Sequence, residues 1–241
     1  MWDAVIPNHL DWPGCRNARD LGGTPTVDGA TIRPRALART DSLHQLNPDG
    51  LRAVRTYGAS RIIDLRRTHE SLAEPNPFAD QPVYFSHPVQ DPMDPDHEWL
   101  DLAGIYIAML DLRPTLFGSA VQAILTAPEG PVIVHCAGGK DRTGLVVGLA
   151  LSVAGVSEEV IAADYALTEE RQRDAVAARL ATITDPQQRE TWARLSATPP
   201  ETMLKVLAHL RAEYGGVHGY LAKGGIRADE LTALRDRLVT R

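Results

Sequence analysis

The stretch Pro131-Val-Ile-Val-His-Cys-Ala-Gly-Gly-Lys-Asp-Arg-Thr-Gly144 decides how the rest of the chain is interpreted. It opens with a short, wholly apolar run up to His135, which is typical of a strand buried on both faces of a sheet. Two glycines follow, and the residues from Thr143 to Ala154 are typical of a buried helix that ends at Gly155. The pattern predicts that Cys136 lies at the carboxyl end of a buried strand, where open α/β sheets bind their ligands.

The segments before this stretch predict a helix followed by strands. Asn47-Pro-Asp-Gly is typical of a helix start, and Gly58 is placed to end that helix. Residues 60–65 carry a β-branched pair that predicts a buried strand, and residues 83–89 are a second strand candidate. Residues 90–98 are crowded with Asp and Pro, so we expect an irregular loop there, which is a candidate active-site flap.

Helical patterns flank the central stretch on both sides. Helical periodicity runs through residues 100–127 and is interrupted at Pro114. Ser157 is a good cap for another helix, and helical patterns dominate from there to the C-terminus. Residues 168–197 are charged and rich in alanine, with apolar positions at helical spacing. They predict a helical insertion in a chain that we expect to form a single domain, residues 1–241.

The composition is that of a globular protein without a general attraction to polyanions. The 241 residues are 44% hydrophobic and 23% charged, and the formal net charge is −6. This charge disfavours nonspecific binding to nucleic acid or anionic membranes, so any phosphate site must be a local arrangement of donors. Two cysteines form no disulfide framework, the first residues lack the pattern of a secretory signal, and no apolar run approaches the roughly 20 residues that span a bilayer. We therefore expect a soluble, cytoplasmic protein with no nucleic-acid partner and no integral membrane association.

The glycine turn has the features of a site for a tetrahedral oxyanion. Gly138 and Gly139 allow backbone N–H groups to converge, and the helix that follows adds the positive end of its dipole. The same field favours the thiolate of Cys136, and Arg142 offers a planar, bidentate grip on two phosphate oxygens. The alternative for Cys136 is a buried, inert thiol that ends a core strand. Cys15 has no glycine turn or arginine clamp after it, so we interpret it as structural.

A nucleotide-binding P-loop is a further interpretation, because Gly-Gly-Lys is present. That motif needs Ser or Thr at the position of Asp141 and its first Gly at the position of Val134. The interpretation therefore fails at two positions.

Taken together, these residues resemble the protein tyrosine phosphatase superfamily. Its signature, His-Cys-x5-Arg followed by Thr or Ser, is matched by His135, Cys136, Arg142 and Thr143. More narrowly, the chain looks like the bacterial tyrosine and lipid phosphatase-like group, because every defined position of His-Cys-x-x-Gly-Lys-Asp-Arg-Thr-Gly is present. Further stretches that fit this group are Asn17-Ala-Arg-Asp-Leu-Gly-Gly23, Ile63-Asp-Leu-Arg-Arg67, Tyr214-Gly-Gly and Gly219-Tyr-Leu.

The resemblance implies an α/β fold with a central, mostly parallel sheet flanked by helices, and a phosphatase that uses no metal and no organic cofactor. It implies that Cys136 attacks phosphorus to form a phosphocysteine, while Arg142 stabilises the charge on the phosphoryl oxygens. Thr143 would donate to the departing thiolate, His135 would hold the loop or merely pack at a strand end, and residues 168–197 would form a helical lid. The loop residues expected to bind phosphate are Ala137, Gly138, Gly139, Lys140, Asp141 and Arg142.

Two residues compete for the role of the general acid that protonates the leaving group. Asp141 lies in the loop, where the narrower group places its acid, whereas Asp91 resembles the mobile acid of the dual-specificity branch. We favour Asp141 because a loop residue is within reach of the substrate; its alternative role is a helix cap, and that of Asp91 is a solvated carboxylate. Asp64 either borders the pocket or ties a strand end to its neighbours. Lys140 either binds a second anionic group of the substrate or lies on the surface.

The substrate class stays open at this point. The resemblance suggests a phosphomonoesterase of phosphotyrosine proteins and/or phosphoinositides. Because only 5% of the residues are aromatic, the chain has no obvious platform for a phenol ring, and a small phosphorylated metabolite such as a nucleotide, sugar or inositol phosphate is the alternative. A noncatalytic phosphate-binding module would not require the thiol, and sulfur transfer would leave the acid unexplained.

Overall fold

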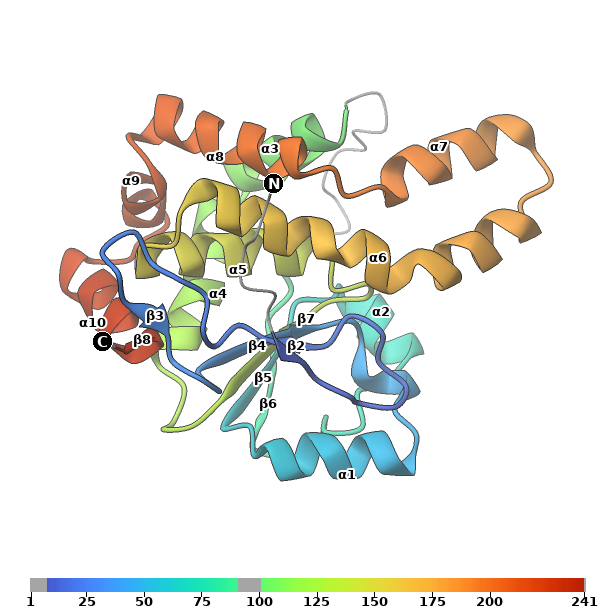
Figure 1. Cartoon of the computed structure of the whole chain (residues 1–241), viewed down its shortest axis with the longest axis horizontal. Helices are drawn as coiled ribbons and strands as arrows, with labels where there is room; N and C mark the ends of the chain where they lie inside the picture. The colour runs from blue at the N-terminus through green and yellow to red at the C-terminus, as the bar shows by residue number, and fades with distance from the viewer. Residues whose placement is uncertain (1–7, 91–100, 241) are drawn as a thin grey trace.

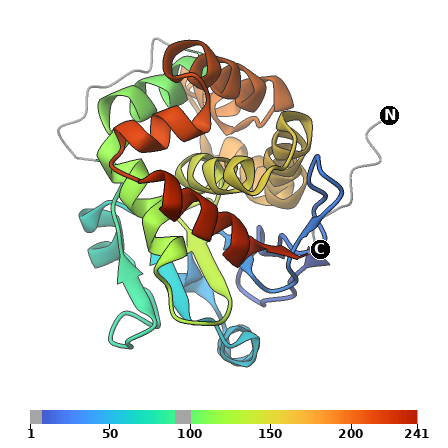
Figure 2. The same cartoon turned by 90° about the vertical axis from the view of Figure 1, so that its left-hand side faces the viewer.

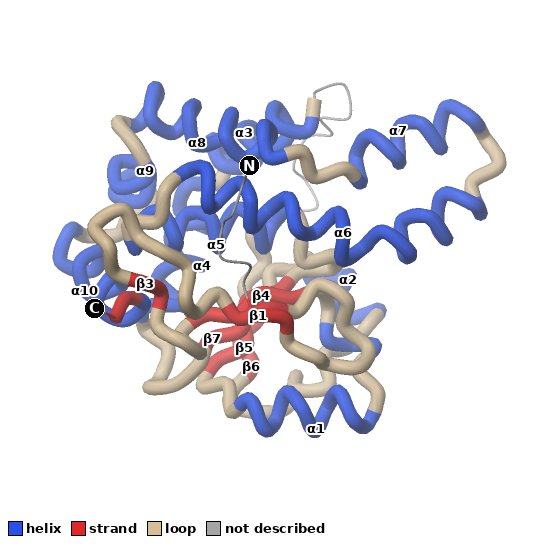
Figure 3. Tube along the Cα trace, viewed as in Figure 1, coloured by secondary structure: helices blue, strands red, loops and turns tan. Residues whose placement is uncertain are grey.

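The computed structural model describes residues 8–90 and 101–240, and its centre is a six-stranded sheet. The strands follow the order β1-β2-β4-β7-β5-β6, and they are drawn in red in Figure 3. Strands β4, β7, β5 and β6 are parallel, whereas β1 and β2 pair antiparallel at one edge. The expected α/β fold with a mostly parallel central sheet is confirmed. The strand bounds are Asn8–His9 (β1), Arg19–Asp20 (β2), Leu37–Thr40 (β4), Arg61–Asp64 (β5), Tyr84–Ser86 (β6) and Val132–His135 (β7).

The position of β7 inside the sheet explains why its sequence is wholly apolar. Alternate side chains of a strand point to opposite faces. Ile133 joins a cluster with Phe78 on one face, while Val132 and Val134 join the larger core on the other. All residues of β7 are buried. Both faces of the strand are therefore shielded from solvent, as its composition predicts.

Helices cover the two faces of the sheet unequally (Figures 1 and 2). Helix α1 (Pro48–Tyr57) packs on one face, and α2 (Thr68–Ala73) follows the carboxyl end of β5, while a short 3-10 turn, η1 (Leu43–Gln45), follows β4. Because α5 lies between the sheet and the outer helices, it is buried along almost its whole length. The thick layer on the other face consists of α3 (Leu102–Leu112), α4 (Pro114–Leu125), α5 (Asp141–Ala154), α6 (Glu158–Thr182), α8 (Pro200–Tyr214), α9 (Val217–Lys223) and α10 (Ala228–Leu238).

Most predicted boundaries are confirmed by the local chemistry that suggested them. The side chain of Asn47 accepts hydrogen bonds from the first N–H groups of α1, and Gly58 ends that helix with a left-handed φ of 69°. Pro114 separates α3 from α4. Two boundaries differ from the prediction. Strand β6 has only 3 residues because prolines bracket it, and α5 begins at Asp141 rather than at Thr143.

Residues 168–197 are mostly helical, as predicted, and form an arm that projects from the helical layer (Figure 1). This helical arm consists of the second half of α6 and of α7 (Pro186–Ser196). The first half of α6 belongs to the core, where Ile161 and Tyr165 are buried, and its burial ends at Thr168. No residue of α7 is buried. The arm is therefore a continuation of a core helix, and no helix end separates it from the core.

A second, two-stranded sheet joins an N-terminal segment to the C-terminal end of the described chain. Strand β3 (Thr31–Ile32) pairs antiparallel with β8 (Val239–Thr240). Within the two described ranges, no helix is both long and apolar enough to cross a membrane. Residues 91–98 of the predicted flap lie outside the described residues.

Candidate active site

The predicted loop lies between β7 and α5, at the carboxyl end of an inner strand. Cys136 follows β7 directly and is only 1% exposed. Arg142 lies in the first turn of α5 and is also buried. Burial lowers the pKa of Arg142, but the contact with Glu70 and the charge of Cys136 outweigh this effect and raise the pKa above its usual value. The predicted nucleophile and the predicted clamp are thus close enough to interact electrostatically.

The loop requires glycine at position 139. Gly139 has a left-handed φ of 62°, and a Cβ added there would lie 2.3 Å from the carbonyl oxygen of Thr40. Thr40 ends β4, the strand beside β7, so the loop passes tightly across the end of its neighbour. The Ser42 N–H donates to the Ala137 carbonyl at 2.9 Å and fixes the preceding part of the loop. The second glycine of the motif is therefore a steric necessity.

Side chains outside the loop bind its carbonyl oxygens. The Asn17 amide donates to the carbonyls of Gly138 and Gly139, both at 3.1 Å. Arg39 donates to the Gly139 carbonyl at 2.7 Å. None of the N–H groups of residues 137–142 donates to a backbone carbonyl of the described residues. With its carbonyls occupied, the loop keeps its N–H groups available for an anion.

A buried ionic network holds those donors in place. Asp164, on the core half of α6, pairs with Arg19 at 2.7 Å and with Arg39 at 2.6 Å. Arg19 in turn donates to the side-chain oxygen of Asn17. Burial opposes the ionisation of Asp164, but the two guanidinium groups outweigh it and lower the pKa of its carboxyl. We call Asn17, Arg19, Arg39 and Asp164 the loop scaffold.

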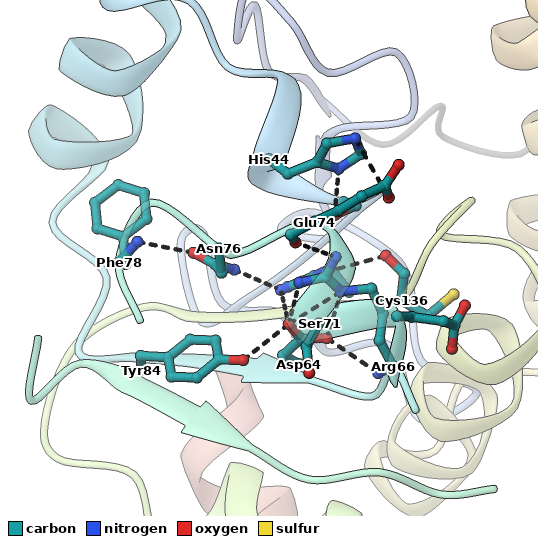
Figure 4. Close-up of polar contacts among 12 residues, drawn as sticks. His44, Asp64, Arg66, Ser71, Glu74, Asn76, Phe78, Tyr84 and Cys136 are labelled. Atoms are coloured by element: carbon teal, nitrogen blue, oxygen red, sulfur yellow. Dashed lines mark hydrogen bonds and ion pairs between the residues drawn. The ribbon is translucent and has the colours of Figure 1, made fainter. Parts of the chain in front are cut away.

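His135 holds the base of the loop as a neutral ring. Its Nε2 accepts from the Asn76 amide at 3.0 Å, and its Nδ1 donates to the Cys136 carbonyl at 3.1 Å. Burial lowers the pKa of His135 despite the nearby Asp64 carboxylate. A neutral imidazole has one acceptor and one donor, which matches these two bonds. In Figure 4, Asn76 lies on one side of this cluster and Cys136 on the other, with Asp64 between them.

Asp64 is buried and tied to its neighbours. Its carboxylate accepts from Nε and Nη2 of Arg66 and, at 3.0 Å, from the Tyr84 hydroxyl (Figure 4). Burial favours the neutral acid, but the hydrogen bonds and the charge of Arg66 outweigh it and lower the pKa of Asp64. These contacts favour the strand-end role over a place at the pocket edge. Asp91 lies outside the described residues.

Glu70 pairs with Arg142, a contact that we did not predict from the sequence. Its two carboxylate oxygens accept from Nη1 and Nη2 of the guanidinium, the latter at 2.9 Å. Glu70 lies in the first turn of α2, shortly after β5, which is the parallel neighbour of β7. The sequence did contain a signal for this contact, namely an acidic residue soon after the strand that ends at Asp64. Neighbouring parallel strands bring the residues that follow them to the same edge of the sheet. The pair uses one N–H of each Nη, so the edge formed by Nε and Nη2 stays able to bind a phosphoryl group.

Asp141 opens α5, and its side chain is 43% exposed. Its Oδ1 accepts a hydrogen bond from the Tyr106 hydroxyl, and no N–H group of the described residues caps its carboxylate. The contacts therefore do not support the cap alternative.

Lys140 is only 6% exposed, so it is not a surface lysine. Its ammonium group lies 3.3 Å from the Asp141 Oδ1 and donates to the Leu195 carbonyl in the helical arm.

Comparison with known proteins agrees with this geometry. A family model described as the tyrosine phosphatase family matches residues 10–240. The chain belongs to this family. A tyrosine-protein phosphatase of Nostoc commune is 28% identical over 233 residues, which cover 89% of this chain and 78% of the relative. The triple specificity protein phosphatase PtpB of Mycobacterium tuberculosis is 29% identical over 277 residues, which cover 94% of this chain and 98% of the relative.

The chain is thus an enzyme of the protein tyrosine phosphatase type, and its substrate is phosphorylated. Two other side chains of the phosphatase differ in what they can contribute. Thr143 is fully buried, and in the part of the chain that the structure describes its Oγ1 has no hydrogen-bond partner, so it can donate to a thiolate. Burial and the charge of Asp41 raise the pKa of Cys15 to about 12, so its thiol stays protonated. Across residues 8–90 and 101–240, no three His, Cys, Asp or Glu side chains form a group that could hold a metal ion.

Proposed function

We propose that this phosphatase is a cysteine-dependent phosphomonoesterase that forms a phosphocysteine intermediate at Cys136. The loop between β7 and α5 supports the proposal best, because its carbonyl oxygens are bound by the loop scaffold and its N–H groups remain for an oxyanion. The positive end of the α5 dipole and the Arg142 guanidinium lie at the same place. Such a field stabilises both a thiolate and the phosphoryl group that it attacks.

In the first step, the Cys136 sulfur attacks phosphorus in line, and the bond from phosphorus to the leaving oxygen breaks. Asp141 gives its proton to that oxygen, so the alcohol or phenol leaves as a neutral molecule. The loop N–H groups and Arg142 bind the equatorial oxygens, where charge develops in the transition state. Glu70 orients the guanidinium before the substrate arrives, which reduces the entropy lost on binding.

In the second step, water attacks the phosphocysteine, and the bond from sulfur to phosphorus breaks. Asp141, now a carboxylate, takes a proton from that water, and inorganic phosphate is released. Thr143 donates a hydrogen bond to the departing thiolate. His135 holds the Cys136 carbonyl throughout, so the nucleophile keeps its position between the two steps.

The substrates that we propose are phosphotyrosine proteins and/or phosphoinositides. Support for phosphotyrosine proteins comes from the names of the relatives, one a tyrosine-protein phosphatase and the other a triple specificity protein phosphatase. The proposal of phosphoinositides rests on the resemblance of the loop sequence to the tyrosine and lipid phosphatase-like group. We propose that residues 1–241 act as one phosphatase domain, since β3, in the N-terminal part, pairs with β8 at the C-terminal end of the described chain. The helical arm is proposed as a lid over the substrate, because it contacts the loop through Gln172 and Leu195.

Steady-state hydrolysis of a panel of phosphate esters tests the proposed function. The panel contains phosphotyrosine peptides, phosphoinositides, nucleotides and sugar phosphates, and it is measured with wild type, Cys136→Ser and the matched control Cys15→Ser. We expect turnover of the first two classes, a loss of at least about 10³-fold in Cys136→Ser, and wild-type rates in Cys15→Ser.

Each other outcome would change a defined part of the proposal. A preference for nucleotides or sugar phosphates would keep the chemistry and replace the substrate class. Turnover that survives Cys136→Ser would contradict the phosphocysteine route. Tight binding of phosphate esters without any turnover would indicate a binding module.

A further inference from the structure

The hydroxyl of Tyr106 makes a contact whose role the proposed chemistry leaves unexplained. Tyr106 lies within α3 and is 1% exposed. Its O–H donates to Oδ1 of Asp141, and the Lys140 ammonium group lies 3.3 Å from the same oxygen. The other oxygen, Oδ2, accepts no hydrogen bond from the described residues. The two oxygens of this half-exposed carboxylate are therefore unequal, because the protein holds only one of them.

Tyr165, on the core half of α6, fixes the Tyr106 hydroxyl in turn. The two hydroxyl oxygens are 2.9 Å apart, and the rings meet edge to face at 6.1 Å. A phenol donates one proton, and Tyr106 gives its own to Asp141, so Tyr165 is the donor between the two tyrosines. Burial, helped by the charge of Asp141, raises the pKa of Tyr106 far above its usual value. Tyr106 therefore keeps its proton at neutral pH and is not itself the acid.

We propose that Tyr106 is a positioning residue for the general acid, because it holds Oδ1 of Asp141 so that Oδ2 carries the transferred proton. The inference rests on the proposed role of Asp141. When Oδ2 gives its proton to the leaving oxygen, the Tyr106 hydroxyl and the Lys140 ammonium stabilise the new carboxylate at Oδ1. In the second step, in which water attacks the phosphocysteine, Oδ2 takes a proton from that water while the same donors hold Oδ1.

This role predicts two effects that a purely structural tyrosine would not produce. An acid matters most for a weakly acidic leaving group, which departs poorly without a proton, so loss of positioning should affect such substrates selectively. A hydrogen bond to the charged form favours that form. Removing the Tyr106 hydroxyl should therefore move the alkaline limb of the pH profile, which reports loss of the acid's proton, to higher pH.

The test compares kcat/KM of wild type, Tyr106→Phe and Asp141→Asn on p-nitrophenyl phosphate, which has an acidic leaving phenol, and on phenyl phosphate, which does not. On phenyl phosphate we expect kcat/KM to fall about 10²-fold in Asp141→Asn and about tenfold in Tyr106→Phe. On p-nitrophenyl phosphate we expect kcat/KM of Tyr106→Phe to fall only about twofold. Tyr165→Phe should act in the same direction with a smaller loss, and it serves as the second variant if Tyr106→Phe folds poorly.

The matched control is Tyr220→Phe. Tyr220 is equally buried, and its hydroxyl also donates to α3, at the Leu110 carbonyl, 3.0 Å away. This variant should retain wild-type rates on both substrates. Equal losses of Tyr106→Phe on both phosphates with an unmoved alkaline limb, or no loss on either, would overturn the positioning role. If Asp141→Asn itself shows no dependence on the leaving group, the acid assignment in the proposed function is wrong and the inference from it is overturned too.

Discussion

Two very different regions hold the phosphate loop. Behind the loop lies the loop scaffold, whose ionic members Arg19, Arg39 and Asp164 are at most 5% exposed. Beside the loop lies the helical arm, which contacts it through the side chain of Gln172 and the carbonyl of Leu195. Both of these residues are partly exposed, and no residue of α7 is buried.

The difference separates what shapes the loop from what controls access to it. Removing one partner of a buried ion pair leaves an uncompensated charge in a dry environment and costs about 3–5 kcal/mol, whereas an exposed contact contributes about 0–1 kcal/mol. We therefore expect the scaffold to determine the loop conformation. We expect the arm to change how substrates reach the loop while leaving its conformation intact.

Asp164→Asn should have the largest effect. It leaves the guanidinium groups of Arg19 and Arg39 buried without their common counter-ion, and we expect the free energy of unfolding to fall by about 3–5 kcal/mol. Asp164 also holds Arg39 in place, and Arg39 binds the Gly139 carbonyl of the loop. We therefore expect the substitution to reduce kcat/KM strongly. Urea denaturation and hydrolysis of p-nitrophenyl phosphate measure the two effects.

Glu158→Gln is the matched control for this variant. Glu158 lies on the same helix and pairs with Arg211 at 3.1 Å, but at the surface. Its loss should cost no more than about 1 kcal/mol and leave kcat/KM unchanged. Equal costs for the two variants would remove the distinction between the buried and exposed regions.

Acid should weaken the scaffold, because protonation removes the charge of Asp164. The pKa of Asp164 is lower in the folded protein than its ordinary value of 3.8. Its contribution to stability is therefore fully present above pH 3.8 and is lost as the pH falls through the lower, folded pKa. Urea midpoints measured across this range should fall less steeply with acid in Asp164→Asn than in wild type. If the urea midpoints of wild type and Asp164→Asn fall equally with pH, the charge of Asp164 does not stabilise the fold.

Glu70→Gln should have an intermediate effect, since the pair with Arg142 is only partly buried. We expect kcat/KM to fall about tenfold, which corresponds to roughly 1.4 kcal/mol, because the guanidinium loses its charged partner. The control is Glu74→Gln, just after the same helix, whose exposed carboxylate pairs with His44 at 3.4 Å. Steady-state kinetics should show wild-type values for that variant. A faster Glu70→Gln enzyme would indicate that Glu70 competes with phosphate rather than orienting Arg142.

The features that could be predicted from the sequence are those that depend on near neighbours along the chain. The caps at Asn47 and Gly58, the buried strand before Cys136 and the glycine turn all carry their own local chemistry. The contacts that could not be predicted join distant positions. Glu70 meets Arg142 across 72 positions, and Tyr106 meets Asp141 across 35, because the sheet order and the helix packing bring them together.

Gln172→Ala should have the smallest effect. It removes the side-chain contact of the arm to the Gly138 carbonyl, and we expect the free energy of unfolding to change by less than about 1 kcal/mol. On p-nitrophenyl phosphate, kcat/KM should stay within about threefold of wild type. A loss as large as that of Asp164→Asn would mean that the arm, too, shapes the loop.

The central claim is that Cys136 carries the phosphoryl group between the two chemical steps. Acid quenching of the wild-type enzyme during turnover of a phosphotyrosine peptide, followed by mass spectrometry of the proteolytic fragment that contains Cys136, tests it most directly. We predict a phosphoryl group on Cys136 in wild type, and neither the adduct nor turnover in Cys136→Ser. Turnover with Cys136 unmodified and the phosphoryl group on another residue would contradict the account.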